Sequence, residues 1–291
     1  MRLKPRAFEY VRAESLQDVF SVLDTHGDEA KLLAGGQSLV PALNMRLAAP
    51  AIIVDVNAVA DLRGIGMAGD RLRIGAMSRY GEVAASDLVA RHAPLIARAI
   101  PFIAHPAIRN RGTFGGSLCN ADPASELPAC ALALQAVFNL RSSAGERAVA
   151  AEDFFVGTYT TALEPNEILV SVDLPVAADD AVFFFDEVVR RRGDYAMAGL
   201  AASAVRRSGI LGELRLAFFA VSDRPYLAEA AMALAEGPAA ESLDVEAVCA
   251  ALGRDFVPQE DLVTSSAAKL HLMQVLTRRA LAAFAAGRPQ A

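Results

Sequence analysis

Two glycine-containing segments are the parts of this sequence best suited to chemistry. In Leu32–Leu39 a strand-like apolar run leads directly into Gly35–Gly36, and Arg109–Leu118 contains a second pair, Gly115–Gly116. Hydroxyl side chains flank both pairs: Ser38, Thr113 and Ser117. Because glycine adopts backbone conformations closed to other residues, successive N–H groups can converge on an anion, and a diphosphate can approach the main chain. Either pair alone is typical of a tight turn, but two such segments in one chain favour a bound diphosphate.

A third glycine pattern, G-x-G-x-x-G at Gly64–Gly69, does not meet the requirements of a dinucleotide site. In a Rossmann unit this pattern follows a strand and opens a helix whose N-terminus meets the phosphates. Here it precedes a strand-like run, Leu72–Gly75, so it cannot offer a helix terminus. The sequence predicts a turn at this point.

An acidic segment, Asn120–Pro128, follows the second glycine pair. Asp122–Pro123 is a typical helix start, with the aspartate as N-cap. Glu126 allows a second interpretation, because a carboxylate can accept two hydrogen bonds from the hydroxyl groups of a ribose. The sequence alone leaves both open.

Composition narrows the function classes. The chain has 291 residues and a net charge of -6, which argues against a nucleic-acid partner. The three cysteines have no CxxC spacing and the four histidines are scattered, so neither a disulfide framework nor a metal site is predicted. Cys119 reads as a small buried hydrophobe. No histidine or tyrosine stands out as a catalytic base. The N-terminus does not lead into an apolar core of a signal peptide, and no apolar run approaches the ~20 residues of a membrane span, so a cytoplasmic location is expected.

The pattern of elements predicts an α+β protein with two domains, residues 1–176 and 177–291. Ser15 and Asp18 form a capping-box pattern ahead of the first helix, and Gly27 offers its stop. Strand-like runs and a helical stretch, 78–103, broken near Pro94 and Pro101, follow without βαβ alternation. The strand-like runs are 31–34, 51–56, 72–77, 137–141 and 168–174. Beyond a boundary at 175–180, strands are expected at 182–189, 200–205 and 214–221, and helices at 226–235, 245–252 and 267–286. Three strands followed by helices predict a small antiparallel sheet packed on a helical layer.

Taken together, the motifs resemble those of the medium, flavin-binding subunits of molybdenum hydroxylases, the family of carbon monoxide and xanthine dehydrogenases. The resemblance covers nearly the whole chain, in order. It rests on these segments: Ala34–Pro41, His105–Ser117, Ala121–Pro128, Glu167–Leu169 and Arg190–Ala196. At Glu187 the family often has lysine, and a carboxylate there would disfavour an anionic reduced flavin.

The resemblance implies a two-lobed FAD-binding domain similar to that of vanillyl-alcohol oxidase, followed by a smaller C-terminal domain. It implies non-covalent FAD, with the diphosphate held by both glycine segments. The cofactor-binding residues it implies are Leu33, Ala34, Gly35, Gly36, Gln37, Ser38, Leu39, Ile103, Thr113, Phe114, Gly115, Gly116, Ser117, Glu126 and Leu169. Ile103 and Leu169 would lie near the flavin or adenine rings.

The resemblance also implies partners. A small subunit with 2Fe-2S clusters and a large molybdopterin subunit would assemble with this chain, as a dimer of heterotrimers. Electrons would pass from the iron–sulfur clusters through FAD to an external acceptor. A self-sufficient flavin oxidase or reductase of the same fold, and a scaffold subunit without flavin, are the alternatives.

Overall fold

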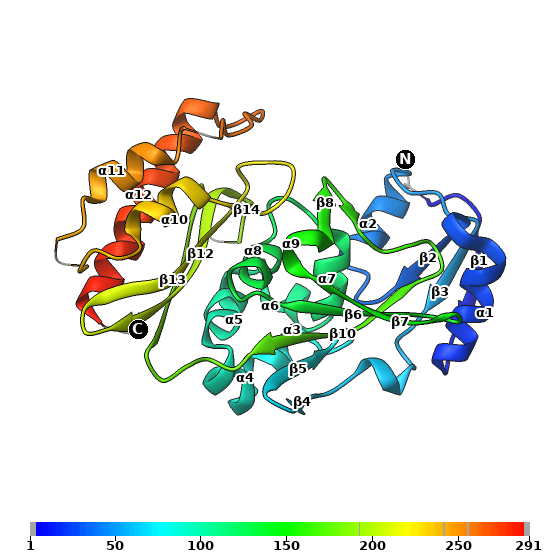
Figure 1. Cartoon of the computed structure of the whole chain (residues 1–291). Coiled ribbons are helices and arrows are strands. Elements are labelled where there is room, and N and C mark those ends of the chain that lie inside the picture. The colour runs from blue at the N-terminus through cyan, green and yellow to red at the C-terminus, as the bar shows by residue number, and fades with distance from the viewer. Residues whose placement is uncertain (1–3, 192, 241, 255, 288–291) are drawn as a thin grey trace.

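The chain folds into three parts arranged in a row (Figure 1). A computed structural model describes residues 4–191, 193–240, 242–254 and 256–287. Arg192, part of the Arg190–Ala196 motif, and the terminal residues Met1–Leu3 lie outside these ranges. The first two parts are lobes, which together contain the elements from β1 to β10. The third part is the C-terminal region (Figure 1).

The N-terminal lobe is a parallel three-stranded sheet covered by a helix. Strand order is β1–β3–β2, with bounds β1 Glu9–Arg12, β2 Ala30–Leu33 and β3 Ile52–Asp55. The helix α1, Leu16–His26, begins at the predicted capping box of Ser15 and Asp18 and ends at Gly27. Its apolar face, with Val19 and Phe20, packs on the sheet. A short helix, α2 (Leu39–Asn44), follows the first glycine segment.

The middle lobe is an antiparallel five-stranded sheet with helices against it. The order β4–β5–β10–β6–β7 places the late strand β10 between strands from two earlier hairpins. Strand bounds are β4 Ile65–Ala68, β5 Arg71–Gly75, β6 Val137–Ser142, β7 Gly145–Ala150 and β10 Ile168–Pro175. Helix bounds are α3 Tyr80–Ala84, α4 Asp87–His92, α5 Pro94–Ala99, α6 Pro106–Arg109, α7 Phe114–Asn120, α8 Glu126–Ala133 and α9 Ala151–Phe154. A small hairpin, β8 (Phe155–Gly157) with β9 (Thr160–Thr161), completes the lobe.

Three local predictions need correction. The pattern Gly64–Gly69 is mostly strand β4, and only its last glycine lies in the turn to β5, although the absence of a helix there was predicted correctly. The helical stretch 78–103 breaks after Ala84 as well as near the two prolines. The helix expected at Asp122–Pro123 starts later, at Glu126, because Asp122 Oδ1 accepts from Ala124 N and closes a turn instead.

The C-terminal part has the predicted architecture, an antiparallel sheet with helices on one face. The sheet order is β11–β12–β13–β14, and its bounds are β11 Ala181–Val189, β12 Ala196–Arg207, β13 Ile210–Phe219 and β14 Tyr226–Leu227. The helices are α10 Glu229–Ala235, α11 Val245–Ala251 and α12 Ser266–Ala286. Tyr226–Leu227, expected in the first of these helices, instead pairs with β13. Buried lysine Lys269 of α12 donates to Ala220 O at 2.7 Å and pairs with Asp261.

The opposite face of this sheet packs on the middle lobe, so the two parts share one hydrophobic core. Phe183, Phe185 and Phe219 belong to the same apolar cluster as the core of the middle lobe. Helix α5 contacts β11, and helix α8 contacts β12 and β13. Gly199 makes room for the Phe219 ring, since a Cβ at Gly199 would come within 2.0 Å of it.

Candidate functional site

The two glycine segments lie against each other where the N-terminal and middle lobes meet. Gly35 faces the main chain of the second segment: a Cβ on it would lie 2.5 Å from Arg111 O and 2.8 Å from the Gly112 Cα. Ala34 in turn lies beside Gly116, whose Cβ would be 3.4 Å from that of Ala34. The sequence reasoning that grouped these segments in one site is therefore consistent with their contact in the fold.

The first segment presents unpaired N–H groups. No main-chain or side-chain acceptor is found, among the residues that the structure describes, for the N–H groups of Gly35, Gly36, Gln37 and Ser38. Gly36 has φ of +73°, the left-handed conformation that favours glycine and lets neighbouring N–H groups turn toward one point. The Gln37 side chain donates to Gly35 O at 3.0 Å, which fixes that peptide group. Leu33 and Leu39 end the flanking strand and begin the flanking helix.

The second segment has a different local structure from the loop that was expected. Phe114, Gly115, Gly116 and Ser117 lie in helix α7 rather than in a loop, with Thr113 as its N-cap. Their N–H groups already donate within the protein, to Ser78 O, Ala76 O, Thr113 Oγ1 and Thr113 O. This segment therefore contributes close main-chain approach and hydroxyl groups rather than a row of N–H donors. Ser117 Oγ lies 3.0 Å from Ser125 Oγ.

Arginines gather around the contact of the two segments, and sequence reasoning missed them. Arg79 donates to Arg111 O and to Asn57 Oδ1, and Arg63 donates to Asn57 O at 2.8 Å. Burial, and then the nearby guanidinium groups of Arg63 and Arg111, lower the pKa of Arg79. A cluster of cations beside free N–H groups suits a ligand with two negative phosphates. The available signal in the sequence was Asn57, a polar residue two positions after the end of strand β3.

Carboxyl groups occupy the boundary with the C-terminal sheet. Glu126 is partly buried, and burial followed by repulsion from Asp122 raises its pKa to about 7. Glu187, on the face of β11 turned toward the middle lobe, has its pKa raised to about 8 by burial and then by Glu126 and Asp186. The two glutamates are thus electrostatic neighbours.

Two predicted site residues contribute side chains to the core. Ile103 is 7% exposed and Leu169 is 2% exposed, so little of either residue is accessible to a cofactor. The Ile103 carbonyl accepts from Arg109 at 2.8 Å. Burial raises the pKa of the Cys119 thiol to about 12, which fits the prediction of an unreactive cysteine.

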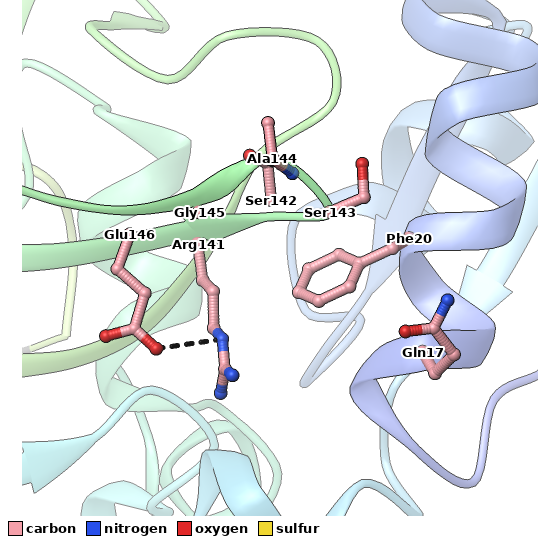
Figure 2. Close-up of a pocket in the computed structure, with 8 residues that line it drawn as sticks. All are labelled: Gln17, Phe20, Arg141, Ser142, Ser143, Ala144, Gly145 and Glu146. Atoms are coloured by element: carbon pink, nitrogen blue, oxygen red, sulfur yellow. Dashed lines mark hydrogen bonds and ion pairs between the residues drawn. The ribbon is translucent and has the colours of Figure 1, made fainter.

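Two open pockets lie away from the glycine segments. One of about 240 Å³ opens between α1 and the β6–β7 hairpin, beside Phe20 and the Arg141–Glu146 ion pair of 3.0 Å (Figure 2). Another, of about 370 Å³, lies between Phe155 and Tyr226 at the C-terminal sheet. Neither is lined by a residue of the glycine segments. Within the described ranges, no three histidine, cysteine, aspartate or glutamate residues cluster as a metal site would require. In the same ranges no helix is both long and apolar enough to cross a membrane.

Comparison with known proteins agrees with the geometry. Residues 6–177 match the family model "FAD binding domain in molybdopterin dehydrogenase", and residues 183–284 match "CO dehydrogenase flavoprotein C-terminal domain". The chain is 34% identical over 277 residues to the carbon monoxide dehydrogenase medium chain of Hydrogenophaga pseudoflava, covering 95% of this chain and 96% of that one. It is 41% identical over 200 residues to the 6-hydroxypseudooxynicotine dehydrogenase complex subunit alpha of Paenarthrobacter nicotinovorans, covering 69% and 68%.

Structural similarity is equally extensive. A chain from the solved carbon monoxide dehydrogenase of Hydrogenophaga pseudoflava superposes with a TM-score of 0.94 at 36% identity, covering 97% of this chain and 99% of that one. These matches cover both the FAD-binding domain and the C-terminal domain, and the mixed α and β fold agrees with them. The chain belongs to the FAD-binding medium subunits of the molybdenum hydroxylases, which are components of oxidoreductase complexes.

Proposed function

We propose that this chain holds FAD at the contact of its two glycine segments and passes electrons onward within a heteromeric molybdenum hydroxylase. FAD supplies two-electron redox chemistry when bound. The electrons would come from 2Fe-2S clusters in a small subunit, after substrate oxidation in a large molybdopterin subunit. They would leave to an external acceptor. A dimer of heterotrimers in the cytoplasm is the assembly we propose.

The row of unpaired N–H groups from Gly35 to Ser38 is the observation that carries this proposal. Gly35, Gly36 and Gln37 are partly buried, and a partly buried N–H group without a protein acceptor is costly unless a ligand or water satisfies it. The guanidinium groups of Arg63, Arg79 and Arg111 beside them favour a doubly anionic ligand. The diphosphate of FAD has this charge, and its length allows the flavin end to extend toward the C-terminal sheet.

Individual residues have distinct proposed tasks. Gly35, Gly36, Gln37 and Ser38 would donate main-chain N–H groups to the diphosphate. Ser117 would offer a hydroxyl group from helix α7, and Glu126 would accept from a ribose or ribityl hydroxyl. Thr113, which is 2% exposed and caps α7, would hold the start of that helix against the cofactor. The remaining proposed contacts are through main-chain atoms or packing: Leu33, Ala34, Leu39, Ile103, Phe114, Gly115, Gly116 and Leu169. In this chain the residues bind and orient the cofactor, and none is assigned as a catalytic acid or base.

We expect an affinity-tagged chain, isolated from its native host, to bring an iron–sulfur protein and a molybdenum protein with it. The reason is that a flavin without its own substrate base needs an outside source of electrons. Metal analysis and an activity assay of the purified complex provide the measurement. A lone flavoprotein that oxidises an organic substrate without iron or molybdenum would contradict the proposal. A purified complex that lacks flavin would instead support the scaffold alternative.

We further expect all of the flavin to be released by acid precipitation. Covalent flavin attachment needs a nucleophilic side chain, and Gln37, an amide already hydrogen-bonded to Gly35 O, occupies the place directly after the glycine pair. The measurement is the flavin absorbance of the supernatant against that of the pellet. Flavin that stays with the precipitated protein would show that the attachment is covalent.

A further inference from the structure

Two side chains outside the glycine segments connect them through main-chain carbonyls. Asn57 Nδ2 donates to Leu33 O at 3.3 Å and to Ala34 O at 2.9 Å, where strand β2 becomes the first segment. Arg79 donates through one nitrogen to Asn57 Oδ1 and through the other to Arg111 O in the second segment. Asn57 and Arg79 thus form a continuous polar bridge between the two segments.

The bridge is itself held in place from both lobes. Asp55 Oδ1 accepts from Asn57 N at 2.9 Å and from Asn57 Nδ2 at 2.6 Å, while Asp55 Oδ2 accepts from Tyr10 at 2.6 Å. Although burial raises the pKa of Asp55, these hydrogen bonds outweigh it and hold that pKa below its usual value. On the other side, Arg79 N donates to Glu82 Oε2 at 2.7 Å at the start of α3.

Peptide geometry links this bridge to the free donors. In a trans peptide group the C=O of one residue and the N–H of the next point in opposite directions. A bond from Asn57 to Ala34 O therefore turns the Gly35 N–H away from Asn57. In the same way, the bond from Gln37 to Gly35 O directs the Gly36 N–H. The hydrogen bonds to Ala34 O and Gly35 O therefore set the directions of the Gly35 and Gly36 N–H groups.

We propose that Asn57 and Arg79 are positioning residues for FAD: they hold the two glycine segments together and fix the direction of the Gly35 N–H group. This inference rests on the proposed FAD site. Arg79 also brings a positive charge to the same place, but its two directed bonds tie the lobes together. Neither residue is required to touch the cofactor, and neither lies in a glycine segment.

The test measures FAD affinity and apoprotein melting temperature in the full-length chain. Asn57→Asp keeps the shape but turns an oxygen toward two carbonyls, and Arg79→Lys keeps the charge but cannot make both bonds. Matched controls make the same changes elsewhere in the middle lobe. Asn139→Asp removes a bond to Ser171 Oγ of 3.1 Å, and Arg73→Lys disrupts the paired bonds to Asp173.

We expect Asn57→Asp and Arg79→Lys each to raise the Kd for FAD by about tenfold or more, measured where the apoproteins are fully folded. Both controls should keep a Kd within about twofold of the original chain even where they lower the melting temperature. The double variant Asn57→Asp/Arg79→Lys should lose less than the product of the single losses, because the two residues act as one bridge.

An original chain that binds FAD, with Asn57→Asp and Arg79→Lys binding it equally tightly, would overturn this inference alone. An original chain that takes up no FAD would overturn the proposed function and this inference with it. If Asn57→Asp does not fold, Asn57→Ala removes the amide without adding a charge. Its Kd then decides in the same way.

Discussion

We expect Gly35→Val to abolish FAD binding while the apoprotein remains folded. The new Cβ would lie 2.5 Å from Arg111 O and 2.8 Å from the Gly112 Cα, and both are main-chain atoms that cannot rotate aside. Relief requires the two glycine segments to separate, at a cost of about 3 kcal/mol, which corresponds to roughly a hundredfold loss of affinity. The measurement is flavin bound per purified chain, with circular dichroism to establish that the variant is folded.

Gly66→Val is the control for this change. Gly66 lies in strand β4, and a Cβ there meets nothing within 4 Å, so valine fits a strand position well. Gly36→Val and Gly116→Val should resemble Gly35→Val. At Gly36 the φ of +73° would be strained, and at Gly116 the Cβ would lie 2.5 Å from Thr113 Oγ1, which caps α7. Loss of flavin in Gly66→Val together with its retention in Gly35→Val would mean that the wrong glycine pattern had been assigned.

The pair of glutamates at the boundary predicts a stability that falls as the pH rises. The pKa of Glu126 is raised to about 7 and that of Glu187 to about 8, in each case mainly by burial. The folded chain therefore holds these protons more tightly than the unfolded chain, in which a glutamate titrates near ~4.3. The contribution of the two protonated glutamates to folding is fully present below the glutamate pKa of the unfolded chain. It is lost as the pH rises through about 7 and then 8.

Replacing Glu187 by glutamine should remove much of this dependence. We expect Glu187→Gln to gain about 1–2 kcal/mol of unfolding free energy over the original apoprotein near pH ~8.5, and little near pH ~4, after allowance for partial exposure. Glu187→Lys should gain more at the higher pH, because an ammonium group beside Glu126 favours its ionised form. Urea denaturation at the two pH values gives the measurement. Glu146→Gln, at a carboxylate that is 68% exposed, serves as the control, and equal gains in it would refute the assignment.

Local signals predicted much of the fold, whereas tertiary contacts decided the rest. The capping box at Ser15 and the strands of the C-terminal sheet follow from patterns within a few residues. Helix α7 was missed because two adjacent glycines lower helix propensity, and only packing of Gly115 on Ala76 makes the helix favourable there. Strand β1 was not predicted, since its four residues form a strand through pairing with β3.

The candidate site also combines features that the sequence predicts with features that only tertiary contacts decide. The glycine pairs are visible in the sequence, and so their placement at one contact could be anticipated. The sequence could not show that only the first pair leaves its N–H groups unpaired. The acceptor for Gly115 N, Ala76 O, comes from a distant turn, and the acceptor for Gly116 N, Thr113 Oγ1, is in place only once helix α7 has formed. The bridge of Asn57 and Arg79 depends on four parts of the chain that folding brings together, and no sequence spacing predicts it.

The apolar cluster that unites Phe183, Phe185 and Phe219 with helices α5 and α8 has a consequence for biosynthesis. During translation the FAD-binding region is complete before β11–β13 have left the ribosome. Until those strands arrive, the outer face of α8 is an uncovered hydrophobic surface, the kind of intermediate that chaperones bind and that aggregates when the chain stalls. Truncation after residue 177 would make that transient state permanent. Exchange of C-terminal regions between related subunits would succeed only where the incoming strands β11–β13 present apolar side chains that fit helices α5 and α8.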